Sequence, residues 1–180
     1  MHNQSLLNEY FSTKWKPNSN IHTYSGPSVI AQKIASHEQV LDIGCGQNPF
    51  RALLPNVVGI DPAFEQADVH CTIEQFETDQ LFDVATCLGS INFGSRDTIE
   101  LQVAKVVSLL KPCARIYWRL NPGRQDHADS ACQQIPFFPW TLEYLNKLAD
   151  KHGFRQENAQ VESGASLGKS VVRLYAEWHR

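Results

Sequence analysis

The stretch that decides the fold is Val40–Phe50, VLDIGCGQNPF, in which a mostly apolar run leads directly into a glycine turn. Residues 40–43 have the short, apolar character of a buried parallel strand. Gly44 and Gly46 let the backbone approach a ligand closely, and a helix start after such a turn offers unpaired N–H groups to a negative group. Asn48 is the non-glycine residue that best tolerates a left-handed backbone, so it can replace a third glycine. We interpret the stretch as a strand followed by a ligand-binding loop.

A second candidate strand, NVVGID at 56–61, ends in Asp61, which follows Gly46 by 15 residues. A carboxylate at the end of a second parallel strand can accept hydrogen bonds from the two hydroxyls of a ribose. The loop and the acid together predict a nucleoside site. Two structural roles stay open, because a glycine turn can also be a plain strand-to-helix corner and Asp42 can bond the loop's own N–H groups.

The rest of the chain alternates between strand and helix patterns. We expect an N-terminal extension over residues 1–26 and one α/β domain over 27–180, with helices on both faces of an open sheet. Thr141 is a candidate N-cap and Gly153 a helix stop. Strands are expected at 67–71, 81–88, 114–120, 154–161 and 170–178, and helices at 6–11, 26–37, 50–54, 96–111 and 139–154.

Composition limits the class of protein. A chain of 180 residues suits one domain, and a formal charge of −3 argues against a nucleic-acid binder that works by bulk electrostatics. The five cysteines are odd in number and form no CxxC pair, so we expect reduced thiols, a cytoplasmic location and no metal site. The sequence has no apolar run near the roughly 18 residues that a membrane span needs.

Five segments carry a family resemblance. In order and spacing, VLDIGCG, VVGID, ADVHCTIEQF, LFDVATCLGSINF and LLKPCARIYW resemble the motifs of the class I S-adenosylmethionine-dependent methyltransferases. The resemblance covers residues 27–178 and is greatest to compact members without a separate substrate domain. It implies a Rossmann-like fold whose mostly parallel sheet has seven strands, the last of them antiparallel. It also implies S-adenosyl-L-methionine as the cofactor and methyl transfer as the activity.

The resemblance assigns roles residue by residue. The methionine end of the cofactor would lie against the glycine loop, the ribose against the acid after the second strand, and the transferable methyl above the end of the strand at 81–88. Thr72, after the third expected strand, aligns with an acid that often binds adenine in this family. The implied cofactor-binding residues are Asp42, Gly44, Cys45, Gly46, Asn48, Asp61, Thr72, Cys87, Leu88 and Ser90.

Methyl transfer makes modest demands on acid–base chemistry, because the sulfonium is already a good leaving group and alignment matters most. If the acceptor needs a base, the loop at 121–138 offers Asp126 and His127 as catalytic candidates. Aromatic residues of the extension are candidates for a lid over the site, although plain packing is an equal alternative: Tyr10, Phe11, Trp15 and Tyr24.

The acceptor is expected to be a small molecule or an exposed group on a larger one, with nucleic acid less favoured. The sequence does not indicate an oligomeric state. Two other function classes stay open. An NAD(P)-dependent oxidoreductase would share a glycine loop and a ribose acid, but it normally has a third glycine and a second nucleotide-binding half. A non-catalytic S-adenosylmethionine-binding, partner or regulatory domain would also keep the loop.

Overall fold

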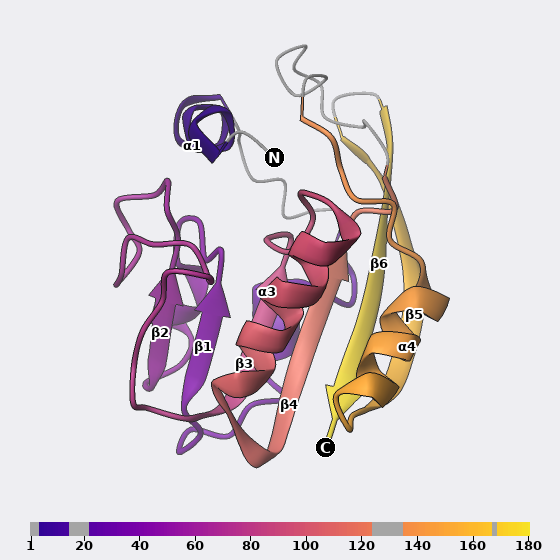
Figure 1. The fold of residues 1–180 in the computed structure, drawn as a ribbon. Coiled ribbons are helices and arrows are strands. Elements are labelled where there is room, and N and C mark those ends of the chain that lie inside the picture. The colour runs from indigo at the N-terminus through magenta and orange to yellow at the C-terminus, as the bar shows by residue number, and fades with distance from the viewer. Residues whose placement is uncertain (1–3, 15–21, 124–134, 167–168) are drawn as a thin grey trace.

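The computed structural model describes residues 4–14, 22–123, 135–166 and 169–180. Its central feature is one six-stranded sheet in the order β2-β1-β3-β4-β6-β5 (Figure 1). The helices are α1 (Gln4–Thr13), α2 (Pro27–Ala31), the 3-10 turn η2 (Pro49–Ala52), α3 (Arg96–Ser108) and α4 (Leu142–Lys151). The strands are β1 (Val40–Ile43), β2 (Val57–Ile60), β3 (Phe82–Leu88), β4 (Leu110–Leu120), β5 (Arg155–Ser166) and β6 (Lys169–His179).

Strand direction follows the expected pattern. β1 lies parallel to β2 and β3, β3 lies parallel to β4, and only the last strand, β6, is antiparallel to its neighbours β4 and β5. The parallel strands therefore end at one common edge of the sheet, where loops from different parts of the chain meet. The α/β class and the reversed last strand are as predicted.

The sheet has six strands where we expected seven. The segment at 67–71 pairs with β2 through one bridge, between Ile60 and Val69. The Asp68 carboxylate accepts a hydrogen bond from the Gly59 N–H at 2.8 Å, which a strand ladder would give to a backbone carbonyl. A side chain thus replaces the backbone partner, and the segment does not continue as a strand.

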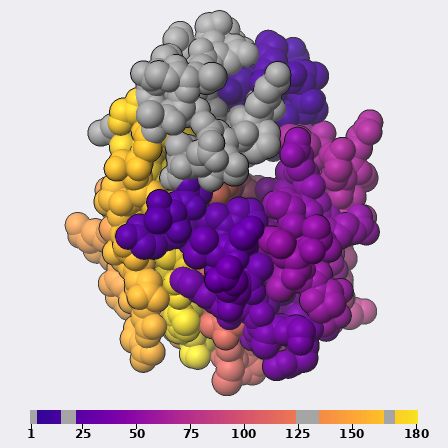
Figure 2. Space-filling model, turned by 180° about the vertical axis from the view of Figure 1, so that it is seen from behind, coloured from indigo at the N-terminus to yellow at the C-terminus, as the bar shows by residue number. Residues whose placement is uncertain are grey.

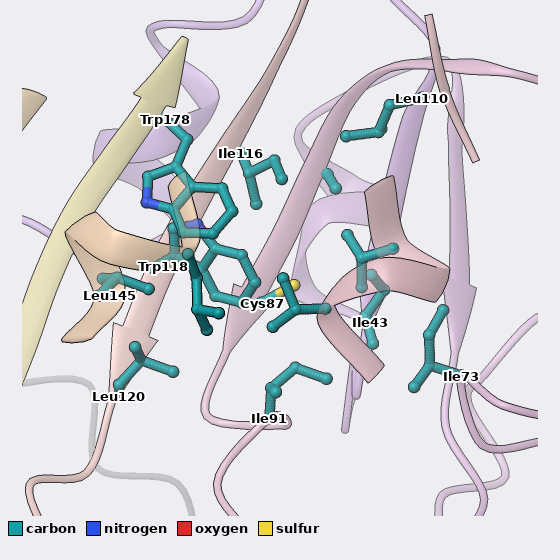
Figure 3. Packing of buried hydrophobic residues seen from close by; sticks show 14 of the residues in the cluster. Ile43, Ile73, Cys87, Ile91, Leu110, Ile116, Trp118, Leu120, Leu145 and Trp178 are labelled. Carbon is teal, nitrogen blue, oxygen red and sulfur yellow. The ribbon is translucent and has the colours of Figure 1, made fainter. Parts of the chain in front are cut away.

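One face of the sheet carries the larger core. Helices α3 and α4 contribute Ile99, Val103 and Leu145 to a cluster that also holds Trp118 of β4 and Trp178 of β6 (Figure 3). The centroids of the two indole rings are 4.8 Å apart, and both side chains are fully buried. The predicted ends of α4 are confirmed, because the Thr141 side chain accepts from Tyr144 N and Gly153 has a φ of +74°.

The other face is covered by shorter segments. Ile30 of α2 and Phe50 of η2 pack against Tyr117 and Tyr175, and early residues of the chain lie across this face (Figure 2). The helix expected over 26–37 ends at Ala31. The backbone then continues in turns whose hydrogen bonds join residues three apart in the sequence.

Helix α1 lies above the carboxyl edge of the parallel strands (Figure 1). Its Leu7 and Tyr10 are buried against Phe93, which follows β3, and against Ile135. Within the N-terminal extension, α1 is thus packed over the carboxyl edge of the sheet. In the described part of the chain, no helix is both long and apolar enough to cross a bilayer.

We expect Trp178→Ala to lower the free energy of unfolding by about 3–5 kcal/mol, because it leaves a cavity beside Trp118. Urea unfolding followed by circular dichroism measures the change. Leu101→Ala on α3 is the control, since Leu101 is 68% exposed and should shift stability by less than about 0.5 kcal/mol. Equal losses in the two variants would contradict the proposed core.

Candidate functional site

The loop after β1 has an unusual backbone. Gly44, Gly46 and Asn48 all have positive φ, at +67°, +55° and +53°. The left-handed conformation predicted for Asn48 is therefore confirmed. The amides of Gly44 and Cys45 both donate to the Ile60 carbonyl at the end of β2, so the loop bends back over the sheet edge.

Close packing explains the first glycine. A Cβ atom on Gly44 would lie 2.4 Å from the Ser90 Cβ, a distance that real side chains do not reach. The loop after β1 thus touches the loop after β3 directly. The Ser90 hydroxyl is buried there and has no hydrogen-bond partner within the described residues. A buried hydroxyl without a partner is uncommon, and it marks a place where a ligand can supply one.

Asp61, directly after β2, joins the loop after β1 to the loop after β2. One carboxylate oxygen, Oδ2, accepts from the Gly46 N–H at 3.0 Å. The other, Oδ1, accepts from Ala63 N at 2.8 Å and Phe64 N at 3.2 Å. A carboxylate has about four acceptor positions, so one remains on Oδ2 for a ligand hydroxyl. Asp61 both fixes the loop and keeps capacity to bind a ribose.

Asp42 is buried in the sheet next to the loop. Its carboxyl group accepts a hydrogen bond from the Thr86 hydroxyl of β3 at 2.5 Å. Burial raises the pKa of Asp42 to about 7, although the Thr86 bond and the positive charge of Arg119 act in the opposite direction. The group therefore changes its charge near neutral pH, unlike an exposed aspartate.

The two cysteines of the expected site have different positions. Cys45 lies in the loop, and burial raises the pKa of its thiol far above the usual range. Cys87 is fully buried in the core with the residues of α3 (Figure 3). Its thiol is directed into the core, so the expected cofactor contact of Cys87 would come from its backbone and stays a prediction.

The remaining expected residues are in part placed. Thr72 uses its N–H and its hydroxyl to bond the Gln75 side chain, as in a local turn. The Leu88 carbonyl accepts from Arg119. Tyr24 stacks on Tyr175, at 6.3 Å between ring centroids. Asp126, His127 and Trp15 lie outside the described residues, so their roles stay predictions.

Sequence reasoning missed three polar side chains at this edge. Asn92 donates to the Gly89 carbonyl and accepts from Asn121 N, so it ties together the loops after β3 and β4. Arg119 of β4 and Glu162 of β5 are held beneath the N-terminal segment. Only Arg119 had a signal in the sequence, a charged residue inside the apolar strand YWRLN, which is rare unless the charge has a partner.

Comparisons with known proteins bear on this site. No protein-family model and no curated protein matches the sequence. Solved structures do resemble it. The 1,6-didemethyltoxoflavin-N1-methyltransferase of Burkholderia thailandensis, solved with 1,6-didemethyltoxoflavin and S-adenosylhomocysteine, has a TM-score of 0.72 and 17% identity over 98% of this chain and 88% of its own.

Two further structures, both solved with S-adenosylhomocysteine, agree. The N-methyltransferase NodS of Bradyrhizobium japonicum has a TM-score of 0.69 and 15% identity over 98% of this chain and 97% of its own. The magnesium protoporphyrin IX methyltransferase of Synechocystis has a TM-score of 0.67 and 11% identity over 99% of this chain and all of its own. Over nearly its whole length, the chain thus has the fold of the class I S-adenosylmethionine-dependent methyltransferases.

The raised pKa of Asp42 predicts a pH-dependent stability. The folded protein holds this proton more tightly than the unfolded chain, so stability falls as pH rises from about 4 to about 7. Asp42→Asn keeps an acceptor for Thr86 and removes the cost of the buried charge. We expect it to raise the free energy of unfolding at pH 8 by about 2–4 kcal/mol, and by much less at pH 4.

Urea unfolding of both proteins between pH 4 and pH 8 measures this difference. A constant difference across the range would show that Asp42 does not titrate as described.

Proposed function

We propose that this chain is a cytoplasmic S-adenosylmethionine-dependent methyltransferase that transfers a methyl group in line to a small molecule or an exposed group. The observation that carries the proposal is the loop at Gly44–Asn48, closed by Asp61, in a fold shared with methyltransferases that bind S-adenosylhomocysteine. Cys45, Cys71, Cys87 and Cys113 are all free thiols, in keeping with a reducing compartment.

The residues at the carboxyl edge suit this cofactor. Asp61 has one acceptor position open for a ribose hydroxyl. Gly44 and Gly46 provide a loop without side chains, against which an amino-acid chain can lie, and the Ser90 hydroxyl lacks a partner. Asp42 would offer a carboxylate to an ammonium group. The adenine-binding residue stays a prediction at Thr72.

The chemistry asks the protein to align and to exclude water. S-adenosylmethionine supplies an activated methyl group on a positively charged sulfur. The glycine loop and Asp61 would hold the nucleoside and amino-acid ends, so that the methyl group points toward the acceptor. Tyr10 and Phe11 of α1, packed with Phe93, would keep water from the acceptor side. Where the acceptor carries a proton, Asp126 or His127 is proposed to remove it.

A small-molecule acceptor is favoured by the chain's size and by its neighbours. No separate substrate domain is present in the described part of the chain, so the loops and α1 must recognise the acceptor. The neighbouring enzymes named above include one crystallised with 1,6-didemethyltoxoflavin and one named for a magnesium porphyrin. Net charge −3 gives no general attraction for nucleic acid.

We expect Asp61→Ala to weaken S-adenosylhomocysteine binding by about 1–3 kcal/mol, because a charge-assisted hydrogen bond to the ribose is lost. Isothermal titration calorimetry measures the change. Asp79→Ala removes the same charge from an exposed position near the amino end of β3 and serves as the control. Its affinity should equal that of the unaltered protein.

Because Asp61 also bonds Gly46 N, loop stability is monitored in the same samples by urea unfolding. An Asp61→Ala protein that unfolds earlier but binds with unchanged affinity would remove Asp61 from the ligand site and leave it a structural role.

A further inference from the structure

We propose that Arg119 binds the carboxylate at the amino-acid end of the cofactor, beside Asp42, which would receive the ammonium group. The inference rests on the proposed function and extends it to a residue outside the glycine loop. It assigns to β4 a binding role in addition to its role in the core. Four observations on the described residues lead to it.

The first observation is the position of the guanidinium. Arg119 is the penultimate residue of β4, close to the carboxyl edge of the sheet. Its Nη2 donates to the Leu88 carbonyl at 2.5 Å and lies 3.8 Å from where a Cβ on Gly89 would be. The next residue, Ser90, is the one that touches Gly44. Arg119 therefore lies directly beside the contact between the two loops that form the site.

The second observation is that no carboxylate bonds the Arg119 guanidinium directly, although Glu162 and Asp42 lie near enough to favour its charged form. A guanidinium has five N–H donors, and Arg119 uses two of its nitrogens on neutral acceptors, the carbonyls of Leu88 and Ser25. Within the described residues it forms no ion pair. Charged groups that leave water are normally paired, because their desolvation costs several kcal/mol per ion. A ligand carboxylate would provide the missing partner.

Arg115 shows what a satisfied arginine on the same strand looks like. It lies four residues earlier on β4, toward the amino edge, and binds both carboxylate oxygens of Glu38 at 2.8 and 3.0 Å. Strand geometry puts both arginines on the same face of the sheet. Arg115 therefore has a structural role, whereas Arg119 keeps N–H donors available for a ligand carboxylate.

The third observation concerns Glu162, the nearest alternative partner, whose carboxylate oxygens accept from other donors. Glu162 of β5 is buried, and its Oε1 accepts from the N–H groups of Tyr24 and Ser25 at 2.5 and 2.8 Å. Its Oε2 accepts from the Ser25 hydroxyl. These bonds fix the N-terminal segment and place the Ser25 carbonyl against Arg119. Both Glu162 oxygens are thus occupied by residues 24 and 25, and Glu162 acts on Arg119 as a nearby charge without a direct bond.

The fourth observation is the complementary charge on β1. Asp42 and Arg119 are close enough to influence each other's ionisation, and burial lowers the pKa of Arg119 to about 10. An anion and a cation beside the same loop match the zwitterionic end of an amino acid. The fixed fork of arginine also suits a carboxylate better than a lysine would.

The test compares two ligands by calorimetry: S-adenosylhomocysteine and its decarboxylated form, which keeps the ammonium and the nucleoside. The variants are Arg119→Met, Arg119→Lys and the control Arg115→Met, each checked by urea unfolding. We expect Arg119→Met to raise the Kd of S-adenosylhomocysteine by about 10- to 100-fold and that of the decarboxylated form by less than about threefold. Arg119→Lys should recover part of the loss, and Arg115→Met should bind both ligands normally.

Equal losses for the two ligands in Arg119→Met would overturn the inference, since Arg119 would then act through the fold alone. Normal binding of S-adenosylhomocysteine by Arg119→Met would overturn it as well, while the proposed function would stand. Failure of the unaltered protein to bind either ligand would overturn the proposed function together with this inference.

Discussion

The hydrogen bond from Gly46 N to the Asp61 carboxylate is the constraint on which the site depends. It connects the loop after β1 with the end of β2 and so fixes a turn in which Gly44, Gly46 and Asn48 all have positive φ. Because Gly44 is held against Ser90, the same turn also sets the position of the loop after β3. The Asp61 carboxylate and the close approach of Gly44 to Ser90 therefore hold together the loops after β1, β2 and β3.

A second layer of order comes from buried and half-buried charged groups beneath that edge. Asp42 bonds Thr86, Arg119 bonds the carbonyls of Leu88 and Ser25, and Glu162 holds the backbone of the N-terminal segment. Burying a charged group costs free energy, so these groups indicate a role in addition to packing. They connect the strands to residues 24 and 25, and they place opposite charges near the glycine loop.

The sequence predicted the loop and the helix ends that are determined by the conformational preferences of single residues. The loop could be predicted because a left-handed turn demands Gly or Asn, and the α4 boundaries because Thr141 caps and Gly153 terminates a helix. The sequence did not indicate that the Asp68 carboxylate would take the place of a backbone hydrogen-bond partner, so a seventh strand was expected at 67–71. Turns after Ala31 likewise shortened a helix that its apolar spacing supported. For Cys87, the sequence indicated a position near the strand end but not that the thiol is directed into the core. Arg119 and Glu162 were missed because their partners come from β3 and residues 24–25, far away in the sequence.

Binding of S-adenosylmethionine at the carboxyl edge is the property on which the proposed function rests. Calorimetric titration of the purified protein with S-adenosylmethionine and S-adenosylhomocysteine, with NAD in parallel, tests it most directly. We predict binding of both sulfur nucleosides with a Kd in the micromolar range, about −8 kcal/mol, and none of NAD. Binding of NAD alone, or of none of the three, would contradict the account.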